Sequence, residues 1–241
     1  MRGGVSRTDS LFPLVWFWRD LESGRMGLAD WLRSRPFTAF YLFAIATILL
    51  LIGMGDTRSC STAVHAFICS HAIWPDQLFS APHLFALSLL TGPWFLHDTQ
   101  HVLYVIAGFL VFVQSYEARA GTKATLIVTF GGTAVAATLV ALALNLGQMQ
   151  YPDSEIITDS MSRNWVGGSV MFYATVGGLA HFARTPWVIL GSTGAFEMWN
   201  HFGNDIMWAT NAAHILSLTF GFIAGFWLHG SRSSEHARES E

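Results

Sequence analysis

The chain has 241 residues, of which 52% are hydrophobic and only 12% are charged, and its mean hydropathy is +0.40. Soluble domains usually contain about 25% charged residues, so this composition excludes a soluble multidomain enzyme, a disordered tail and a disulfide scaffold. The net charge of −3 argues against a nucleic-acid partner, because a protein that binds a polyanion needs a basic surface. The sequence therefore predicts an all-α protein that crosses the lipid bilayer several times.

Six apolar stretches approach the length of about 20 residues that a transmembrane helix needs. In chain order they are Phe37–Met54, His101–Tyr116, Thr125–Leu146, Val166–Ala183, Pro186–Phe202 and Trp208–His229. We expect them to form a six-helix membrane domain over residues 37–230, with an N-terminal segment at residues 1–36 and a tail at residues 231–241. The stretch Ala72–Leu96 contains three prolines, so we expect an interfacial loop there, between the first two helices, and no straight span.

The basic residues indicate an orientation for these six helices. All but two of the 13 Lys and Arg residues fall on one side of a six-span arrangement, and only Arg58 and Arg163 fall on the other. Positive charge marks the cytoplasmic side, so both termini are expected in the cytoplasm and the protein in the cell membrane. Cys60 and Cys69 then share an extracytoplasmic loop, where they either form a disulfide or remain free thiols.

Polar side chains inside the spans are candidates for function, because their burial in lipid is costly. Ser169 in the fourth span and His214 in the sixth lie at similar depths, close to the extracytoplasmic end. Small residues every fourth position in the sixth span would let the two helices approach closely, and Tyr173 could pack under the imidazole. A serine and a histidine in contact are the minimum for nucleophilic catalysis. Taken singly, each residue is more typical of ordinary helix packing.

Three segments in order resemble the rhomboid intramembrane serine proteases. His101 opens the second span, which is followed by Glu-Ala-Arg-Ala-Gly at residues 117–121; the fourth span reads Gly-Gly-Ser-Val-Met-Phe-Tyr at residues 167–173; the sixth reads Asn-Ala-Ala-His at residues 211–214. The resemblance covers roughly residues 90–230.

The resemblance implies a serine endopeptidase that cleaves transmembrane or juxtamembrane segments of other membrane proteins, without a cofactor or a metal. Ser169 would be the nucleophile and His214 the general base, in a dyad without a carboxylate. His101 and the backbone N–H of Ser169 would bind the oxyanion. Supporting residues would be Tyr173, Gly167 and Asn211, and structural residues would be Glu117, Arg119, Gly121, Ser217 and Gly221.

Three positions depart from the family pattern. Val105 replaces an asparagine one turn after His101, Val170 replaces the glycine after the nucleophile, and Ser217 replaces a glycine of the sixth helix. The first two substitutions favour one alternative, a catalytically impaired relative that binds transmembrane clients. A second alternative is a metal or haem protein that uses His97 and His101, although the zinc-protease spacing is lacking.

Polar residues also lie in the fifth span and in the connection between the third and fourth spans. Glu197 and His201 lie four residues apart in the fifth span, where they either pair or mark its extracytoplasmic end. The polar stretch Tyr151–Asn164 is interpreted as a solvated connection between the third and fourth spans.

Overall fold

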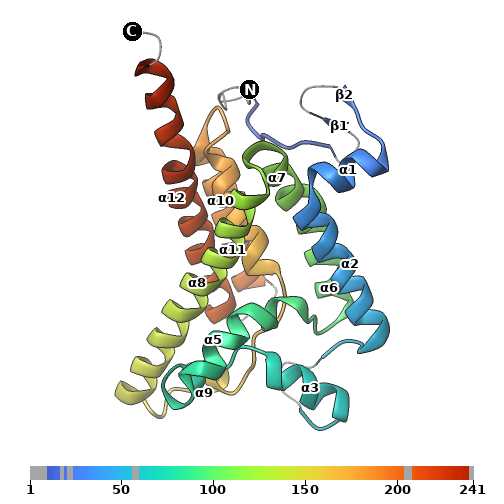
Figure 1. Cartoon of the computed structure of the whole chain (residues 1–241). Helices are drawn as coiled ribbons and strands as arrows, with labels where there is room; N and C mark the ends of the chain where they lie inside the picture. The colour runs from blue at the N-terminus through green and yellow to red at the C-terminus, as the bar shows by residue number, and fades with distance from the viewer. Residues whose placement is uncertain (1–9, 17–18, 21–23, 56–59, 204–207, 239–241) are drawn as a thin grey trace.

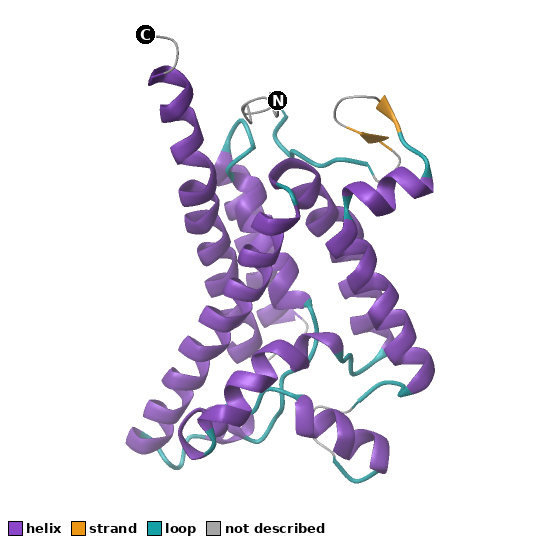
Figure 2. Cartoon of the chain, in the orientation of Figure 1, coloured by secondary structure: helices purple, strands orange, loops and turns teal. Residues whose placement is uncertain are grey.

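The computed structural model describes residues 10–16, 19–20, 24–55, 60–203 and 208–238. The chain is mostly helical, which confirms the predicted class (Figures 1 and 2). Two two-residue strands, β1 (Arg19–Asp20) and β2 (Gly24–Arg25), pair in an antiparallel hairpin before the first helix. Arg58 lies outside the described residues.

The first half of the chain forms one long helix and several short ones. The elements are α1 (Leu28–Ser34), α2 (Pro36–Leu51), α3 (Ala63–His71), α4 (Gln77–Ser80), α5 (Pro82–Thr91) and the 3-10 turn η1 (Gly92–Trp94). Pro36 separates α1 from α2 because a residue before proline avoids helical dihedrals, and the two helices meet at 105°. As expected, Ala72–Leu96 forms no straight span, and its prolines begin short helices.

The second half consists mainly of long helices. They are α6 (Thr99–Gly108), the π-helical turn η2 (Phe109–Val113), α7 (Gln114–Ala120), α8 (Thr122–Gln150), α9 (Glu155–Met161), α10 (Ser169–Ala180), α11 (Pro186–Gly203) and α12 (Trp208–Arg238). Gly121 ends α7 with φ of +82°, a value that favours glycine and turns the chain into α8. The connection Tyr151–Asn164 contains the helix α9, which was not expected.

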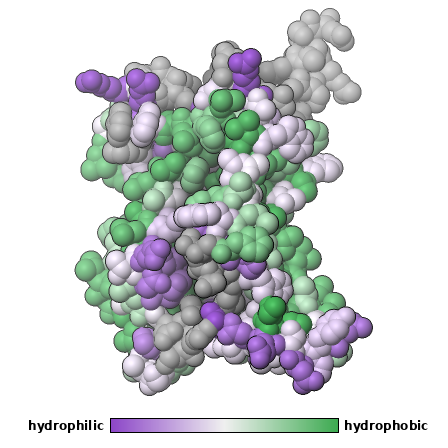
Figure 3. Space-filling view, turned by 180° about the vertical axis from the view of Figure 1, so that it is seen from behind, coloured by the Kyte–Doolittle hydropathy of each residue, from purple (hydrophilic) through white to green (hydrophobic). Residues whose placement is uncertain are grey.

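Three continuous helical stretches are long and apolar enough to cross a membrane. They are Thr99–Ala120, Thr122–Gln150 and Trp208–Leu228; the bent pair α1–α2 becomes a fourth if it counts as one span. Large apolar side chains such as Phe43, Leu50 and Leu51 are more than two-thirds exposed, as expected of a surface that faces lipid. On the face shown in Figure 3, hydrophobic side chains occupy much of the upper half below a hydrophilic rim. The protein is thus consistent with a multi-pass membrane protein.

Helix α10 lies at the centre of the bundle and is shorter than the span predicted for it. It packs against α12, α8, α11 and the α6–η2–α7 helix (Figure 1), and every residue from Met171 to Ala180 is buried. The residues before Ser169 are not helical, because Gly167 has a φ of +102°. Gly177 and Gly221 allow the backbones of α10 and α12 to touch: a Cβ on either would overlap the other helix.

Glu117 joins three elements at the end of the bundle where α2 begins. Its carboxylate accepts hydrogen bonds from the backbone N–H groups of Phe37 and Thr38, at 3.0 and 2.9 Å, and from the hydroxyl groups of Thr38 and Thr122. The first N–H groups of a helix have no partner within it, so Glu117 caps α2 from a neighbouring helix. Glu117 thus connects α7 to the beginnings of α2 and α8.

Arg119, a residue expected to be structural, connects α7 to the residues near the start of the described chain. Its Nε donates to the carbonyl oxygen of Pro13 at 2.8 Å. The N–H of Val15 also donates to Ser115, and the N–H of Arg184 to the carbonyl of Ser10. Residues 10–16 therefore lie as an extended strap across α7 and the α10–α11 connection. We refer to these residues as the N-terminal strap.

Candidate active site

Ser169 and His214 are brought into contact as predicted. The Oγ of Ser169 lies 3.0 Å from Nε2 of His214, and both side chains are buried. Ser169 is the first residue of α10, and His214 lies in the second turn of α12. The close packing of these two helices therefore sets the contact. At this distance the imidazole can accept the proton of the serine hydroxyl.

A carboxylate also reaches His214, and sequence reasoning missed it. Oε2 of Glu197 lies 3.0 Å from Nδ1 of His214, on the side of the ring away from Ser169. The expectation that no carboxylate accompanies His214 is therefore wrong. That expectation was based on the residues around His214 on its own helix, whereas Glu197 belongs to α11. His201 was the partner that the spacing on α11 suggested for Glu197, and these distances show His214 of α12 as a partner. The sequence did contain a signal for this residue, because an acidic side chain within an apolar span is costly and therefore a candidate for function.

Two tyrosines complete a chain of polar contacts around this carboxylate. The ring of Tyr173 stacks on the imidazole of His214, with centroids 4.1 Å apart and planes 4° apart, which confirms the predicted packing. The hydroxyl of Tyr173 donates to Oε1 of Glu197, and the hydroxyl of Tyr104 lies 2.6 Å from that of Tyr173. The plane and position of the imidazole are thus held from two directions.

The N-terminus of α10 supplies hydrogen-bond donors beside Ser169. The N–H groups in the first turn of a helix have no intrahelical acceptor, and the positive end of the helix dipole lies there. The ring of His101 lies against Gly167, where any Cβ would overlap its Cε1 and come within 2.5 Å of Nε2. Within the described residues, Nδ1 of His101 is buried without a hydrogen-bond partner. Backbone and imidazole donors therefore flank the residues that lead into Ser169.

The segment that leads into Ser169 is fixed by the preceding short helices. Trp165 exchanges two backbone hydrogen bonds with Ile73, at 2.8 and 3.0 Å, and the N–H of Gly167 donates to the carbonyl of Gly92. A glycine is needed at position 167 because φ there is positive and because His101 occupies the space of a side chain. Ser169 therefore follows a segment that is held by backbone hydrogen bonds to Ile73 and Gly92.

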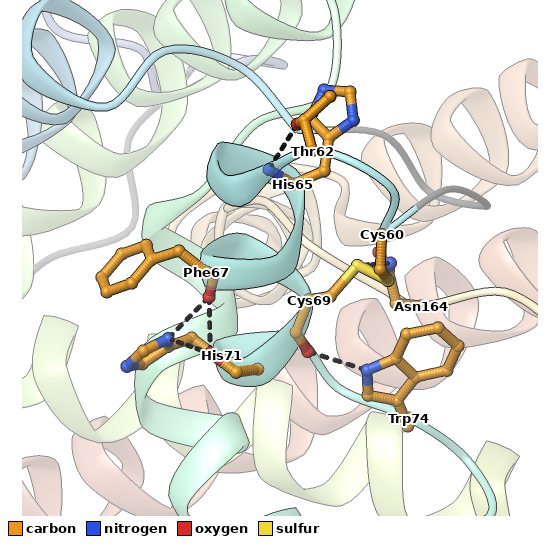
Figure 4. The surroundings of a disulfide bond; sticks show 9 residues. Cys60, Thr62, His65, Phe67, Cys69, His71, Trp74 and Asn164 are labelled. Carbon is orange, nitrogen blue, oxygen red and sulfur yellow. Dashed lines mark hydrogen bonds between the residues drawn. A yellow bond between two sulfur atoms is a disulfide. The ribbon is translucent and has the colours of Figure 1, made fainter.

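The disulfide lies next to this segment. Cys60 and Cys69 are bonded, so the disulfide alternative holds and the free-thiol alternative does not. Figure 4 shows Asn164 beside the disulfide, where its amide donates to Sγ of Cys69 at 3.4 Å. The indole of Trp74 donates to the carbonyl of Cys69 at 2.8 Å. Helix α3 is thereby connected to the residues immediately before Trp165.

A cavity of about 360 Å³ lies beside the polar chain, between α6–η2, α10 and α11. Its walls are almost wholly apolar, and the N-terminal strap contributes Phe12 and Leu14. Tyr104 and Tyr173 form the part of the wall nearest the site. Helix α11, which carries Glu197, forms one side through Ile189 and Phe196, among other residues.

The remaining predicted residues lie in or near these helices. Asn211 is buried one turn before His214, and Ser217 donates to the carbonyl of Val170 at 2.6 Å, joining α12 to α10. The side chain of Val170 packs against buried residues of α8 and α12. Val105 is fully buried in the apolar core. The departure at Val105 therefore places an apolar group where the family pattern has an amide.

His97, just before α6, and His101, in its first turn, have contacts that require no metal. Asp98 caps α6, because its carboxylate accepts the backbone N–H of His101 at 2.7 Å, and it also pairs with His97 at 3.0 Å. In the described part of the chain, no three His, Cys, Asp or Glu side chains gather as a metal site would require. The alternative of a metal or haem protein therefore gains no support from this geometry.

Comparison of the chain with protein-family models gives no match, and comparisons with curated proteins and with solved structures give none either.

Proposed function

We propose that the protein is an intramembrane serine endopeptidase of the rhomboid type. The observation that carries this proposal is the contact of 3.0 Å between Oγ of Ser169 and Nε2 of His214 at the centre of an apolar helical bundle. Acyl transfer requires a nucleophile within hydrogen-bond distance of a base, and donors for the negative charge that develops on the carbonyl oxygen. Ser169, His214 and the N–H groups of the first turn of α10 offer these groups.

The proposed reaction begins when His214 removes the hydroxyl proton of Ser169. The serine oxygen forms a bond to the carbonyl carbon of a peptide bond, and the carbonyl electron pair moves onto its oxygen. The N–H of Ser169 and the ring of His101 stabilise that negative charge. The carbonyl re-forms as the C–N bond breaks, and His214 gives the proton to the leaving amine. His214 then removes a proton from a water molecule whose oxygen attacks the acyl carbon, and it returns that proton to Oγ of Ser169 as the ester bond breaks.

The proposed substrate is a transmembrane or juxtamembrane segment of another membrane protein that unwinds locally. A helical peptide bond hides its carbonyl in a hydrogen bond to the residue four positions later, so an intact helix resists attack. The apolar cavity beside α11 supports sideways access of such a segment from the lipid.

In the proposed topology the protein lies in the cell membrane and crosses it six times. Both termini are then in the cytoplasm. This topology rests on the distribution of Lys and Arg in the sequence. Reporter fusions at Ser61 and at Gly230 test it: opposite sides are expected, and equal signals at the two positions would contradict it.

A second candidate function is a client-binding relative without proteolysis. The buried Val105 favours it, because a valine offers no donor to an oxyanion. A serine-reactive fluorophosphonate separates the two candidates: covalent labelling of the purified chain that is lost in Ser169→Ala and in His214→Ala supports the protease. An unlabelled, folded wild-type protein would favour the client-binding relative.

A further inference from the structure

We propose that Glu197 is the positioning residue of this site, which orients His214 and stabilises its protonated form during catalysis. Ser169, His214 and Glu197 would then act as a triad drawn from three helices, α10, α12 and α11. This inference rests on the proposed function and adds to it a residue that the resemblance did not imply.

The two nitrogens of His214 face different partners. Nε2 lies 3.0 Å from Oγ of Ser169, and Nδ1 lies 3.0 Å from Oε2 of Glu197. An ionised carboxylate can only accept hydrogen bonds, so neutral His214 carries its proton on Nδ1. Nε2 is thereby left with a free electron pair, directed at the serine hydroxyl. The glutamate thus selects the tautomer in which His214 can act as a base.

Glu197 is itself held in one position by several donors. It is 2% exposed, and its Oε1 accepts the hydroxyl proton of Tyr173 while Oε2 faces His214. The side chain of Asn200 forms a further hydrogen bond to it. Since the proton of Tyr173 is used by Glu197, the hydroxyl of Tyr104 must donate to Tyr173. The carboxylate is therefore at the end of an ordered chain of donors.

Burying the charged carboxylate of Glu197 costs free energy, so its presence suggests a role for the charge. Burial of a carboxylate in an apolar helix is unfavourable, and apolar residues of similar volume often stabilise a protein as well as a buried ion pair does. When His214 accepts the serine proton it becomes a cation in the same buried surroundings, and the negative charge of Glu197 then offsets it. The buried charge is thus placed where the proposed reaction develops a positive one.

The test measures how fast a fluorophosphonate labels Ser169 in the purified full chain, which requires no substrate. Glu197→Gln is expected to lower this rate by about 10²- to 10⁴-fold. Glu197→Asp keeps the charge and is expected to recover part of the loss. Glu155→Gln, an exposed acid on α9, is the matched control and should leave the rate unchanged.

The order of the two Glu197 variants separates positioning from packing. Glutamine keeps the size of the side chain and can still accept from Tyr173, so a purely structural role predicts that Glu197→Gln labels faster than Glu197→Asp. Positioning through charge predicts the reverse. Wild-type rates in a folded Glu197→Gln protein would overturn the inference while leaving the proposed function intact. Failure of the wild-type protein to label would contradict the proposed function.

A second measurement remains decisive if Glu197→Gln does not fold. ¹⁵N NMR of histidine-labelled wild-type protein reports which ring nitrogen carries the proton, and the His214 signal is assigned by its loss in His214→Gln. Protonation of Nδ1 is expected. Neutral His214 protonated on Nε2 would overturn the role of Glu197.

Discussion

Gly177 of α10 and Gly221 of α12 lie against each other's helices so closely that neither has room for a side chain. A Cβ on Gly177 would overlap the carbonyl oxygen of Leu218, and a Cβ on Gly221 would overlap that of Ala174. Because α10 carries Ser169 and α12 carries His214, this backbone contact sets the distance between the serine hydroxyl and the imidazole. Stability and activity are therefore expected to depend on the same glycines.

Gly221→Ala tests this dependence. The added methyl group must push α12 away from α10, so we expect a loss of about 1–3 kcal/mol of stability, together with loss of fluorophosphonate labelling. Gly191→Ala on α11 is the control, because its Cβ meets no atom within 4 Å. There the replacement of a helical glycine should be neutral or stabilise by about 0.5–1 kcal/mol. Thermal unfolding in detergent measures both; a Gly221→Ala protein as stable and as reactive as the wild type would contradict the expectation.

Ser169→Ala and His214→Ala are each expected to reduce peptide cleavage to background. The double variant should be no worse than either single one, because the nucleophile and its base act as one unit. Cleavage of a reconstituted transmembrane substrate measures this effect. Retained cleavage by Ser169→Ala would end the serine-protease interpretation.

His101→Ala is expected to lower the cleavage rate by about 10²- to 10³-fold, the usual cost of one oxyanion donor, with little change in the unfolding temperature. Its ring lies against Gly167, close to the nucleophile. His97→Ala is the matched control just before α6, where the ring of His97 lies 4.1 Å from that of His101 between centroids, and its rate should stay within a few-fold of the wild type. Equal losses in the two variants would argue that the histidines act only through packing.

Cys60→Ser is expected to destabilise the protein by about 2–3 kcal/mol. This is the stabilisation expected when a disulfide between cysteines nine residues apart lowers the entropy of the unfolded chain. Because Asn164 contacts Cys69 and precedes the segment that presents Ser169, labelling should also slow. A reducing agent should reproduce the effect in the wild-type protein and add nothing in Cys60→Ser. An unchanged unfolding temperature in both would show that the bond carries no stability.

Glu117→Gln is expected to cost about 3 kcal/mol or more. The amide brings two N–H donors to a site where two backbone N–H groups and two hydroxyl groups already donate, so buried donors lose their acceptor. Exposed Glu155→Gln serves as the control and should unfold at the wild-type temperature. Thermal unfolding monitored by circular dichroism makes the comparison, and equal temperatures for the two variants would contradict the proposed cap.

Several features of the fold could be predicted from local sequence. The composition determined the membrane class, because a chain with so few charges cannot cover its own surface with polar groups. The apolar stretches predicted where the long helices lie, and the prolines of Ala72–Leu96 predicted the interruption there. The similar depth of Ser169 and His214, with the small residues of the last span, predicted their contact, and the spacing of four between Ser169 and Tyr173 placed the tyrosine on the same face.

Contacts between residues far apart in the sequence were decided by the tertiary structure alone, because no local sequence pattern predicts them. Glu197 meets His214 because the face of α11 that carries Glu197 is turned toward α12. The two residues are 17 positions apart on different helices, so their spacing in the sequence does not predict this contact. Arg119 likewise binds the N-terminal strap at Pro13, 106 residues away. Helix periodicity determines which residues share a face, but the partner of that face is chosen by packing of the whole bundle. The sequence by itself therefore determined the apolar helices and indicated the serine–histidine contact, and the packing of three helices decided that a carboxylate reaches the histidine.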